Sequence, residues 1–332
     1  MLNLKYLFHT PDLAEMLLGN FEYDPASLHL FQYYRISSNA VYPFQSGGER
    51  RLLRFAPKGE KRKGNLLAEL DFLAYLRAQR YAVMEAVPVA RAGAGLLAEA
   101  ETPWGAYYAS VFKHVPGVQL GQLELTGHIA RRYGEALGKL HKLSREYRPE
   151  AEQRWTHNEV LEWIRDTLQP CLPEPEAMAA LEETRLLTEY FAQVPLTPDN
   201  YGLIHYDFET DNVFYDSAAD GCHVIDFDDA MYHWYALDLE QALDSLSDAV
   251  APELYEERKD HFMEGYRSCF TLPENGPSAE ACRRFADLYG YTRIRRASAE
   301  AWAHEPEWLT GLRGKLAAAR QRKAAGFGKP LG

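Results

Sequence analysis

The sequence predicts an α+β protein of two lobes, a small β-sheet lobe with one helix followed by a larger, mainly helical lobe. Short β-branched and aromatic runs dominate residues 28–115, whereas apolar residues recur at helical spacing from about residue 127 onward. Pro116 and Gly117 interrupt the pattern between these regions. A chain of 332 residues also has the length of about two domains. We therefore expect an N-terminal lobe at residues 1–115 and a C-terminal lobe at residues 116–332.

Three strands are predicted at the start of the N-terminal lobe. His29–Ile36 and Val41–Gln45 are aromatic and β-branched runs, and the polar residues between them suit a turn. A further turn at Ser46–Gly48 precedes a third run at Arg50–Phe55.

One helix and more strands complete this lobe. Leucines recur at helical spacing and predict a helix near Lys63–Arg80. Strand-like runs follow at Val87–Arg91, Leu96–Ala100 and Ala106–Phe112.

The C-terminal lobe is predicted to be helical apart from one segment. Ile129, Tyr133, Leu137 and Leu140 form the apolar stripe of a helix at about residues 127–147. Similar stripes predict helices at Asn158–Gln169, Glu176–Gln193, Leu237–Leu246, Pro252–Phe270 and Ser278–Tyr289.

The exception is the acidic, strand-like segment Tyr201–Asp229. Its runs Val213–Tyr215 and His223–Ile225 are joined by a turn-rich linker, which predicts a β-hairpin. The last stretch, Gly311–Gly332, is basic, and we expect a solvated helix with a frayed end.

Composition and charge limit the range of functions. The formal net charge of −12 repels the phosphate backbone of nucleic acids. No apolar run approaches the roughly 18 residues that span a bilayer, and the first residues lack the pattern of a secretory signal. The four cysteines have no metal-ligand spacing. We expect a cytoplasmic monomer or homodimer with no nucleic-acid or membrane partner.

The most informative segment contains residues suited to phosphoryl transfer. This reaction needs an oriented acceptor hydroxyl, a group that accepts its proton and metal ions that bridge the phosphates. Asp207 is followed five residues later by Asn212, and the predicted hairpin then returns the chain to Asp226. Asp207 can accept the hydroxyl proton, while Asn212 and Asp226 offer oxygen ligands to Mg²⁺. The hairpin is expected to place Asp226 beside Asn212.

These motifs resemble the aminoglycoside phosphotransferase and choline kinase-like family, which shares the protein-kinase fold. His205-Tyr206-Asp207 through Asn212 matches the family's H-x-D-x-x-x-x-N loop, and Ile225-Asp226-Phe227 matches its I-D-F metal segment. Asp238 matches an Asp that opens the next helix. The resemblance implies a bilobal protein-kinase-like fold with an antiparallel sheet in the N-terminal lobe. It also implies a kinase that uses ATP or GTP and Mg²⁺ to phosphorylate a hydroxyl of a small molecule.

The resemblance further implies roles for individual residues. Asp207 would be the catalytic base or would orient the hydroxyl, and His205 would brace the loop by hydrogen bonds. Asn212 and Asp226 would hold Mg²⁺. Tyr206 differs from the small residue that is common at its position, and this difference bears on the shape of the acceptor.

The N-terminal lobe would cover the nucleotide. Arg54 stands where kinases carry a phosphate-pairing Lys on the third strand, and Glu69 is its expected partner on the following helix. The phosphate-covering loop would contain Ser37, Ser38 and Asn39, although a plain hairpin turn explains these residues equally well. The connector that would hold adenine through its backbone contains Phe112, Lys113, His114 and Val115.

Acidic and aromatic residues are candidates for binding the acceptor. Acids near the active site would attract an amine-bearing alcohol such as an aminoglycoside or a choline-like compound, and a homoserine-like metabolite is a third candidate. Solvated loop charges explain the acids equally well. Trp155 and Trp163 are among the aromatic residues that suit a quaternary amine, although helix packing is their commoner use. The candidate acceptor-binding residues are Glu209, Asp211, Asp228, Asp229 and Trp234.

Two other functions remain open from the residues alone. A metal-dependent phosphoester hydrolase would use the cluster of His205, Asp207, Asp226 and Asp228. A catalytically silent nucleotide-binding protein is the other alternative, and the presence of both Asp207 and Asp226 speaks against it. A protein kinase is disfavoured because Asp226-Phe227-Asp228 is not D-F-G.

Overall fold

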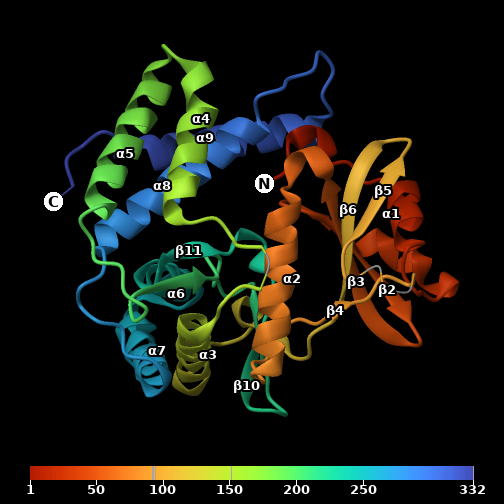
Figure 1. Ribbon diagram of the computed structural model, residues 1–332, viewed down its shortest axis with the longest axis horizontal. Coiled ribbons are helices and arrows are strands. Elements are labelled where there is room, and N and C mark those ends of the chain that lie inside the picture. Colours follow the sequence, from red (N-terminus) through yellow and green to blue (C-terminus); the bar gives the residue numbers. More distant parts are fainter. Residues whose placement is uncertain (92, 94, 151, 332) are drawn as a thin grey trace.

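The computed structural model describes residues 1–91, 93, 95–150 and 152–331 and contains one large sheet beside a group of helices (Figure 1). The strands of this sheet are β1 (Arg35–Ile36), β2 (Ala40–Ser46), β3 (Glu49–Pro57), β4 (Ala86–Val87), β5 (Ala98–Thr102) and β6 (Gly105–Lys113). They pair antiparallel in the order β1-β2-β3-β6, and both β4 and β5 pair with the other edge of β6. The α+β class and the antiparallel sheet are confirmed.

The hairpin between β2 and β3 depends on two glycines. Gly47 and Gly48 have φ angles of 59° and 76°, which L side chains rarely adopt. The Asp24 carboxylate accepts hydrogen bonds from both of their N–H groups, at 3.1 and 3.0 Å. The turn therefore sets the register that pairs Val41 with Arg54.

The strand predicted at His29–Ile36 is mostly wrong. Residues Pro25–Tyr33 wind into 3₁₀ turns, and only Arg35 and Ile36 form strand β1. Leu28 and Phe31, three residues apart, share one side of such a helix and contact the sheet core. The predicted strand Val87–Arg91 is likewise reduced to β4, because Pro88 has no N–H to continue the ladder.

Two helices accompany the sheet, where the sequence predicted one. The unexpected helix α1 (Pro11–Leu18) packs its leucines into the sheet core. The predicted helix α2 (Lys63–Ala78) is confirmed, and its apolar residues join the core of the helical half. Tyr75 of α2 donates to the carbonyl of Leu143 at 3.1 Å. Figure 1 shows α2 between the sheet and the helices.

The second half contains the remaining elements. Its helices are α3 (Gly127–Glu146), α4 (His157–Leu168), α5 (Pro175–Phe191), α6 (Tyr235–Ala249), α7 (Tyr255–Cys269), α8 (Ala279–Ala297) and α9 (Glu307–Ala324). Its strands are β7 (Val118–Gln119), β8 (Tyr201–Ile204), β9 (Val213–Asp216), β10 (Gly221–Val224) and β11 (Met231–Trp234). The predicted helices and the β9–β10 hairpin are confirmed, whereas the pairing of β8 with β11 was not predicted.

Helices α3 and α7 cross at very close range and support the segment after β8. A Cβ atom on Gly134 would lie 1.9 Å from the carbonyl oxygen of Phe262, and one on Gly265 would lie equally close to that of Arg131. Only glycine allows this approach. On the same helix α3, Tyr133 donates to the backbone carbonyl of Phe208 at 2.5 Å.

The connection between the halves runs from β6 to β7, which pairs with β9. The lobe boundary between residues 115 and 116 stays a prediction. Within the described part of the chain, no helix has the length and apolarity that crossing a membrane requires.

A buried histidine is expected to make the fold sensitive to acid. His157 donates from Nδ1 to the Tyr201 hydroxyl at 2.8 Å, because that hydroxyl itself donates to the carbonyl of Tyr232. Burial lowers the pKa of His157 to about 4. In the unfolded chain this histidine is protonated below about pH 6.5, whereas in the folded chain it stays neutral down to about pH 4. Acidification from pH 7 to pH 5 therefore lowers the free energy of unfolding by about 2 kcal/mol.

Urea unfolding at the two pH values measures this effect. His157→Asn keeps a donor towards Tyr201 and should reduce the loss of unfolding free energy on acidification by about 2 kcal/mol. His304→Asn, at an exposed histidine, is the control and should leave the pH dependence unchanged. An equal pH dependence in wild type and His157→Asn would contradict the assignment.

Candidate active site

The segment after β8 is held by a buried carboxylate. Asp238, in the first turn of α6, accepts hydrogen bonds from the backbone N–H groups of His205 and Tyr206, at 2.8 and 2.7 Å. His141 of α3 faces the same carboxylate at 3.3 Å. These bonds support Tyr206 at a φ of 69°, a left-handed conformation that is unusual for a bulky residue. The position of the next residue, Asp207, follows from this anchoring.

His205 connects this loop to the chain that returns from the hairpin. Its Nε2 donates to the carbonyl of Ile225 at 2.9 Å, and its Nδ1 accepts from the N–H of Asp207 at 3.2 Å. The ring is fully buried, and burial lowers its pKa, so it is neutral. These contacts describe how His205 would brace the loop.

Asp207, Asn212 and Asp226 lie together at one end of the β9–β10 hairpin. The Nδ2 of Asn212 donates to the Asp207 carboxylate at 2.9 Å and to the Asp207 carbonyl at 3.0 Å. The N–H of Ile225 donates to the carbonyl of Asn212 at 3.0 Å, which brings Asp226 beside Asn212. Asp226 itself is left-handed, with a φ of 62°.

An ion pair between β3 and α2 reaches the same place. The Arg54 guanidinium donates to both oxygens of Glu69, at 2.8 and 2.7 Å, and both side chains are buried. Its Nη1 also lies 3.8 Å from Oδ1 of Asp226. This fork-shaped contact fixes the cation where it faces the hairpin end.

The electrostatics of Asp207 suit a base. Burial raises the pKa of this carboxyl to about 8, the charges of Glu209, Asp229 and Asp226 add to the shift, and Arg293 opposes it. A carboxylate with a raised pKa holds a proton more tightly than an ordinary one. Asp207 in its ionised form, which predominates above about pH 8, can therefore accept a proton from a hydroxyl group.

Asn212 and Asp226 fit a divalent cation that is shared with phosphate groups. Oδ1 of Asp226 is buried and has no hydrogen-bond partner among the described residues. The Asn212 amide nitrogen is used on Asp207, so its oxygen is the atom available to a metal. The described residues contain no cluster of three or more His, Cys, Asp or Glu that would hold a metal by themselves. Mg²⁺ typically takes one or two protein ligands together with substrate phosphates, which matches this pair.

A cavity of about 210 Å³ lies between the sheet and the hairpin. It brings together most of the residues that the sequence assigned to nucleotide and metal binding. These lining residues are Ser37, Asn39, Arg54, Phe112, Lys113, His114, Val115, Asn212 and Asp226. Glu69 does not line it and acts through Arg54, and Ser38 faces a different cavity.

The apolar lining of this cavity was missed. Val41 and Leu52 come from β2 and β3, Met84 precedes β4, and Phe214 and Ile225 come from the hairpin. Such residues can cover both faces of a planar base. Their apolar character also suits core positions, so the sequence alone gave no signal that they line a cavity.

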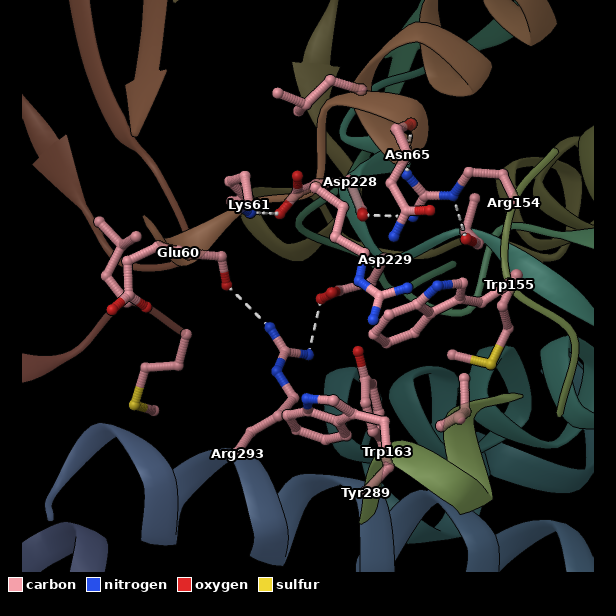
Figure 2. A pocket seen from close by; sticks show the side chains of 18 of the residues that line it. Glu60, Lys61, Asn65, Arg154, Trp155, Trp163, Asp228, Asp229, Tyr289 and Arg293 are labelled. Atoms are coloured by element: carbon pink, nitrogen blue, oxygen red, sulfur yellow. Dashed lines mark hydrogen bonds and ion pairs between the residues drawn. The ribbon is translucent and has the colours of Figure 1, made fainter. Parts of the chain in front are cut away.

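A second cavity, of about 290 Å³, meets the same loop and the same turn. Ser38 lines it from the loop 37–39, and Asp228 and Asp229 line it from the turn after Asp226. Trp155, Trp163 and Tyr289 contribute aromatic walls (Figure 2). The two cavities are therefore neighbours on either side of this loop and turn.

The acids of the second cavity are neutralised. Asp228 is paired with Lys61 at 2.5 Å, and Asp229 is paired with Arg293 at 2.7 Å. Burial opposes ionisation of both carboxyls, but the adjacent cations hold their pKa values below the usual range. Asp228 and Asp229 thus carry no free negative charge that would attract an amine.

The other candidate acceptor-binding residues lie outside both cavities. Glu209 is exposed, and Asp211 is half-buried 3.8 Å from Arg35. Trp234 is fully buried, stacks on Phe191 at 5.0 Å and donates to the carbonyl of Pro195. Its apolar ring is used in the core of the helical half, so the structure does not place Trp234 at the site.

The cluster proposed for a hydrolase does not form a metal site. Both ring nitrogens of His205 are used in hydrogen bonds to the backbone, and Asp228 is held by Lys61. Only Asp207 and Asp226 of that set remain near each other with Asn212. The geometry favours a nucleotide-bound cation over a protein-only metal centre.

Arg293 was missed by sequence reasoning and joins distant parts of the site. From α8, its Nη1 donates to Asp229 at 2.7 Å and its Nη2 donates to the Ser38 hydroxyl at 2.9 Å. Its guanidinium also lies 5.1 Å from the ring centroid of Tyr289. Tyr289 and Arg293 are four residues apart and share one face of α8, but the predicted helix ended at Tyr289, so Arg293 fell outside it.

Comparisons with known proteins agree with this geometry. The phosphotransferase enzyme family matches residues 35–270 of the chain. Amicoumacin kinase of Bacillus subtilis (strain 168) is 22% identical over 274 residues, which cover 80% of this chain and 78% of that protein.

Solved structures of similar proteins cover nearly the whole chain. The amicoumacin kinase hAmiN, in complex with AMP-PNP, Ca²⁺ and Ami, has a TM-score of 0.75 at 18% identity and covers 99% of this chain and 97% of its own. A microcompartment-associated aminopropanol kinase has a TM-score of 0.63 at 22% identity, with coverages of 95% and 96%. Choline kinase LicA from Streptococcus pneumoniae has a TM-score of 0.58 at 11% identity, with coverages of 94% and 98%. The protein-kinase-like fold is confirmed.

Removal of the charge on Glu69 should destabilise the fold. Glu69→Gln leaves the buried Arg54 guanidinium without its anionic partner, and we expect a loss of about 3 kcal/mol in the free energy of unfolding. The control is Glu99→Gln, at an exposed glutamate of β5 that pairs with Lys63 of α2. This variant should have an unfolding midpoint close to that of wild type. Urea unfolding measures both variants, and equal midpoints would show that the Arg54–Glu69 pair contributes nothing.

Loss of the Ser38 hydroxyl should weaken nucleotide binding. Ser38→Ala removes the contact that ties the loop 37–39 to Arg293, and a hydrogen bond to a charged group of this kind corresponds to about tenfold in affinity. Calorimetric titration with AMP-PNP and Mg²⁺ measures the effect. Ser217→Ala, at an exposed serine of the β9–β10 turn that lines neither cavity, is the control and should bind as the wild type does. In an Arg293→Gln background, Ser38→Ala should cause no further loss.

Proposed function

The chain belongs to the phosphotransferase enzyme family, and on this premise we propose that it is a kinase that transfers the γ-phosphoryl group of ATP to a hydroxyl of a small molecule. Asp207, Asn212 and Asp226 carry this proposal, because they converge beside a cavity of nucleotide character with Arg54 facing them. The acceptor would occupy the second cavity, which meets the same loop and turn.

In the proposed reaction the acceptor hydroxyl oxygen forms a bond to the γ-phosphorus. The bond between that phosphorus and the oxygen that bridges it to the β-phosphate breaks, and ADP leaves with the bonding electrons. Asp207 accepts the hydroxyl proton and later releases it to solvent. Mg²⁺ held by Asn212 and Asp226 would neutralise charge on the phosphates when bound.

Other groups of this chain orient the reactants. Arg54, fixed by Glu69, would contact phosphate oxygens from the side of the sheet. Asn212 keeps the Asp207 carboxylate directed into the site through its 2.9 Å hydrogen bond. The raised pKa of Asp207 makes it a stronger base than an ordinary carboxylate.

The other expectations from the sequence stay predictions. A cytoplasmic location would supply ATP and the reducing conditions that suit four free cysteines. The protein is expected to be a monomer or homodimer. The expected absence of nucleic-acid and membrane partners follows from composition and charge. The phosphoryl donor is ATP or GTP, and comparing turnover with the two nucleotides distinguishes them.

Asp207→Asn is the direct test of the proposal. The amide keeps the size of the side chain and its place beside Asn212 but accepts no proton, so turnover should fall by at least about 100-fold. Affinity for AMP-PNP and Mg²⁺ should change little. Asp199→Asn, at an exposed acid paired with Arg145, is the matched control and should retain full activity. Undiminished transfer by Asp207→Asn would refute the assigned role.

Acceptor-stimulated release of ADP identifies the reaction. A suitable panel contains amicoumacin, aminopropanol, choline, an aminoglycoside and homoserine, which represent the compounds that the similar proteins and the sequence suggest. Release of ADP together with a phosphorylated acceptor supports the proposal. Hydrolysis of phosphoesters without any nucleotide would instead favour the phosphoester hydrolase.

A further inference from the structure

We propose that the second cavity binds an acceptor with a planar ring whose edge carries oxygen atoms that accept hydrogen bonds. This inference rests on the proposed function and names the class of compound that the kinase would phosphorylate. It draws on three features of the cavity, which are a row of aromatic rings, a surplus of cations and the position of the row relative to Asp207.

The aromatic rings follow one another through the cavity towards the catalytic loop. The ring centroids of Trp155 and Trp163 are 6.3 Å apart, and those of Trp163 and Tyr289 are 5.8 Å apart. The Tyr289 ring then meets that of Tyr206 at 5.1 Å. Tyr206 is buried behind the cavity lining and directly precedes Asp207, so the row of rings ends at the segment that carries the catalytic carboxylate.

Aromatic walls of this kind bind either a cation or another flat ring. The charges of the cavity distinguish the two. Five cationic side chains line it, against three acidic ones, Glu60, Asp228 and Asp229. Each acid is already paired, with Arg296, Lys61 and Arg293 respectively. The five cations are Lys61, Arg62, Arg154, Arg293 and Arg296.

Two of the cations have no carboxylate partner among the described residues. Arg154 is buried and donates to the backbone carbonyls of Ala230, Asp228 and Asn65. Arg62 is exposed at the cavity, and its guanidinium lies 4.6 Å from the ring centroid of Trp155. The cavity therefore has an excess of positive charge in a protein whose formal net charge is −12. A polycationic acceptor would be repelled there.

The hydrogen-bonding character points in the same direction. Guanidinium and ammonium groups donate and cannot accept, so a ligand that meets them needs acceptor atoms. Carbonyl or carboxylate oxygens on the edge of a ring meet that requirement, and the ring itself covers the indole and phenol faces. The volume of about 290 Å³ has room for a small ring system.

Four small probes with one hydroxymethyl group each separate these features. Para-hydroxymethyl-benzamide has a flat ring and an acceptor oxygen, and para-hydroxymethyl-benzoate adds a negative charge. Para-hydroxymethyl-benzylamine replaces the acceptor with a cation, and the cyclohexane analogue of the benzamide removes the flat ring. Each is titrated by calorimetry into protein saturated with AMP-PNP and Mg²⁺, so binding is read without turnover.

We expect the benzamide and the benzoate to bind about tenfold tighter than the cyclohexane analogue and the benzylamine. Equal or tighter binding of the benzylamine would overturn the charge argument, and equal binding of the cyclohexane analogue would overturn the ring argument. Failure of both flat acceptor-bearing probes to bind would overturn the proposal as a whole. The order between benzamide and benzoate tells whether the natural acceptor is neutral or anionic.

Trp155→Leu tests the proposed wall. It retains an apolar side chain but removes the ring, and the benzamide should bind about tenfold more weakly while affinity for AMP-PNP is unchanged. Trp308→Leu, at an exposed ring on α9, is the matched control. The probe affinities are measured independently of catalysis. If the wild-type protein transferred no phosphoryl group, the kinase proposal would be refuted, but the probe affinities would still test the proposed binding cavity.

Discussion

The candidate site depends on the buried carboxylate of Asp238. Its two oxygens accept the N–H groups of His205 and Tyr206, and these bonds hold the backbone in the conformation that presents Asp207. Burying a carboxylate is costly unless hydrogen bonds replace the lost water, and two backbone donors with the facing His141 supply that replacement. Asn212 and Asp226 can then meet Asp207 because the β9–β10 hairpin starts from this fixed point.

Charged contacts around the second cavity also join the two halves of the chain. Lys61 and Glu60, which precede α2, pair with Asp228 and Arg296 of the helical half, and Ser38 is reached by Arg293. These bonds stay partly accessible to water, which screens the attraction between their charges. The relative position of the sheet and the helices near the acceptor cavity is thus set by polar contacts, whereas α2 is held by apolar ones.

Local patterns predicted the centre of the site, and distant contacts decided what surrounds it. Asp207, Asn212 and Asp226 lie within one loop and hairpin, so their spacing in the sequence already determined their neighbourhood. The partners of Asp228 and Asp229 come from residues 61 and 293, which no local pattern connects to them. For that reason the sequence left open whether these acids attract an amine, and the structure shows that both are paired with cations. The prediction of a strand at residues 29–36 was wrong for a similar reason, because its aromatic residues lie in a 3₁₀ helix that packs against the sheet.

Helix α2 belongs to the N-terminal half of the chain but packs into the core of the helical half. Leu70, Phe72, Leu73 and Leu76 belong to the core of the helical half, although α2 lies before the last strands of the sheet. The segment that follows α2 is fastened to β10, where the N–H of Val224 donates to the carbonyl of Ala82. A fragment ending near residue 115 would consequently expose this leucine-rich surface to water, and such a fragment would aggregate rather than behave as an independent nucleotide-binding unit.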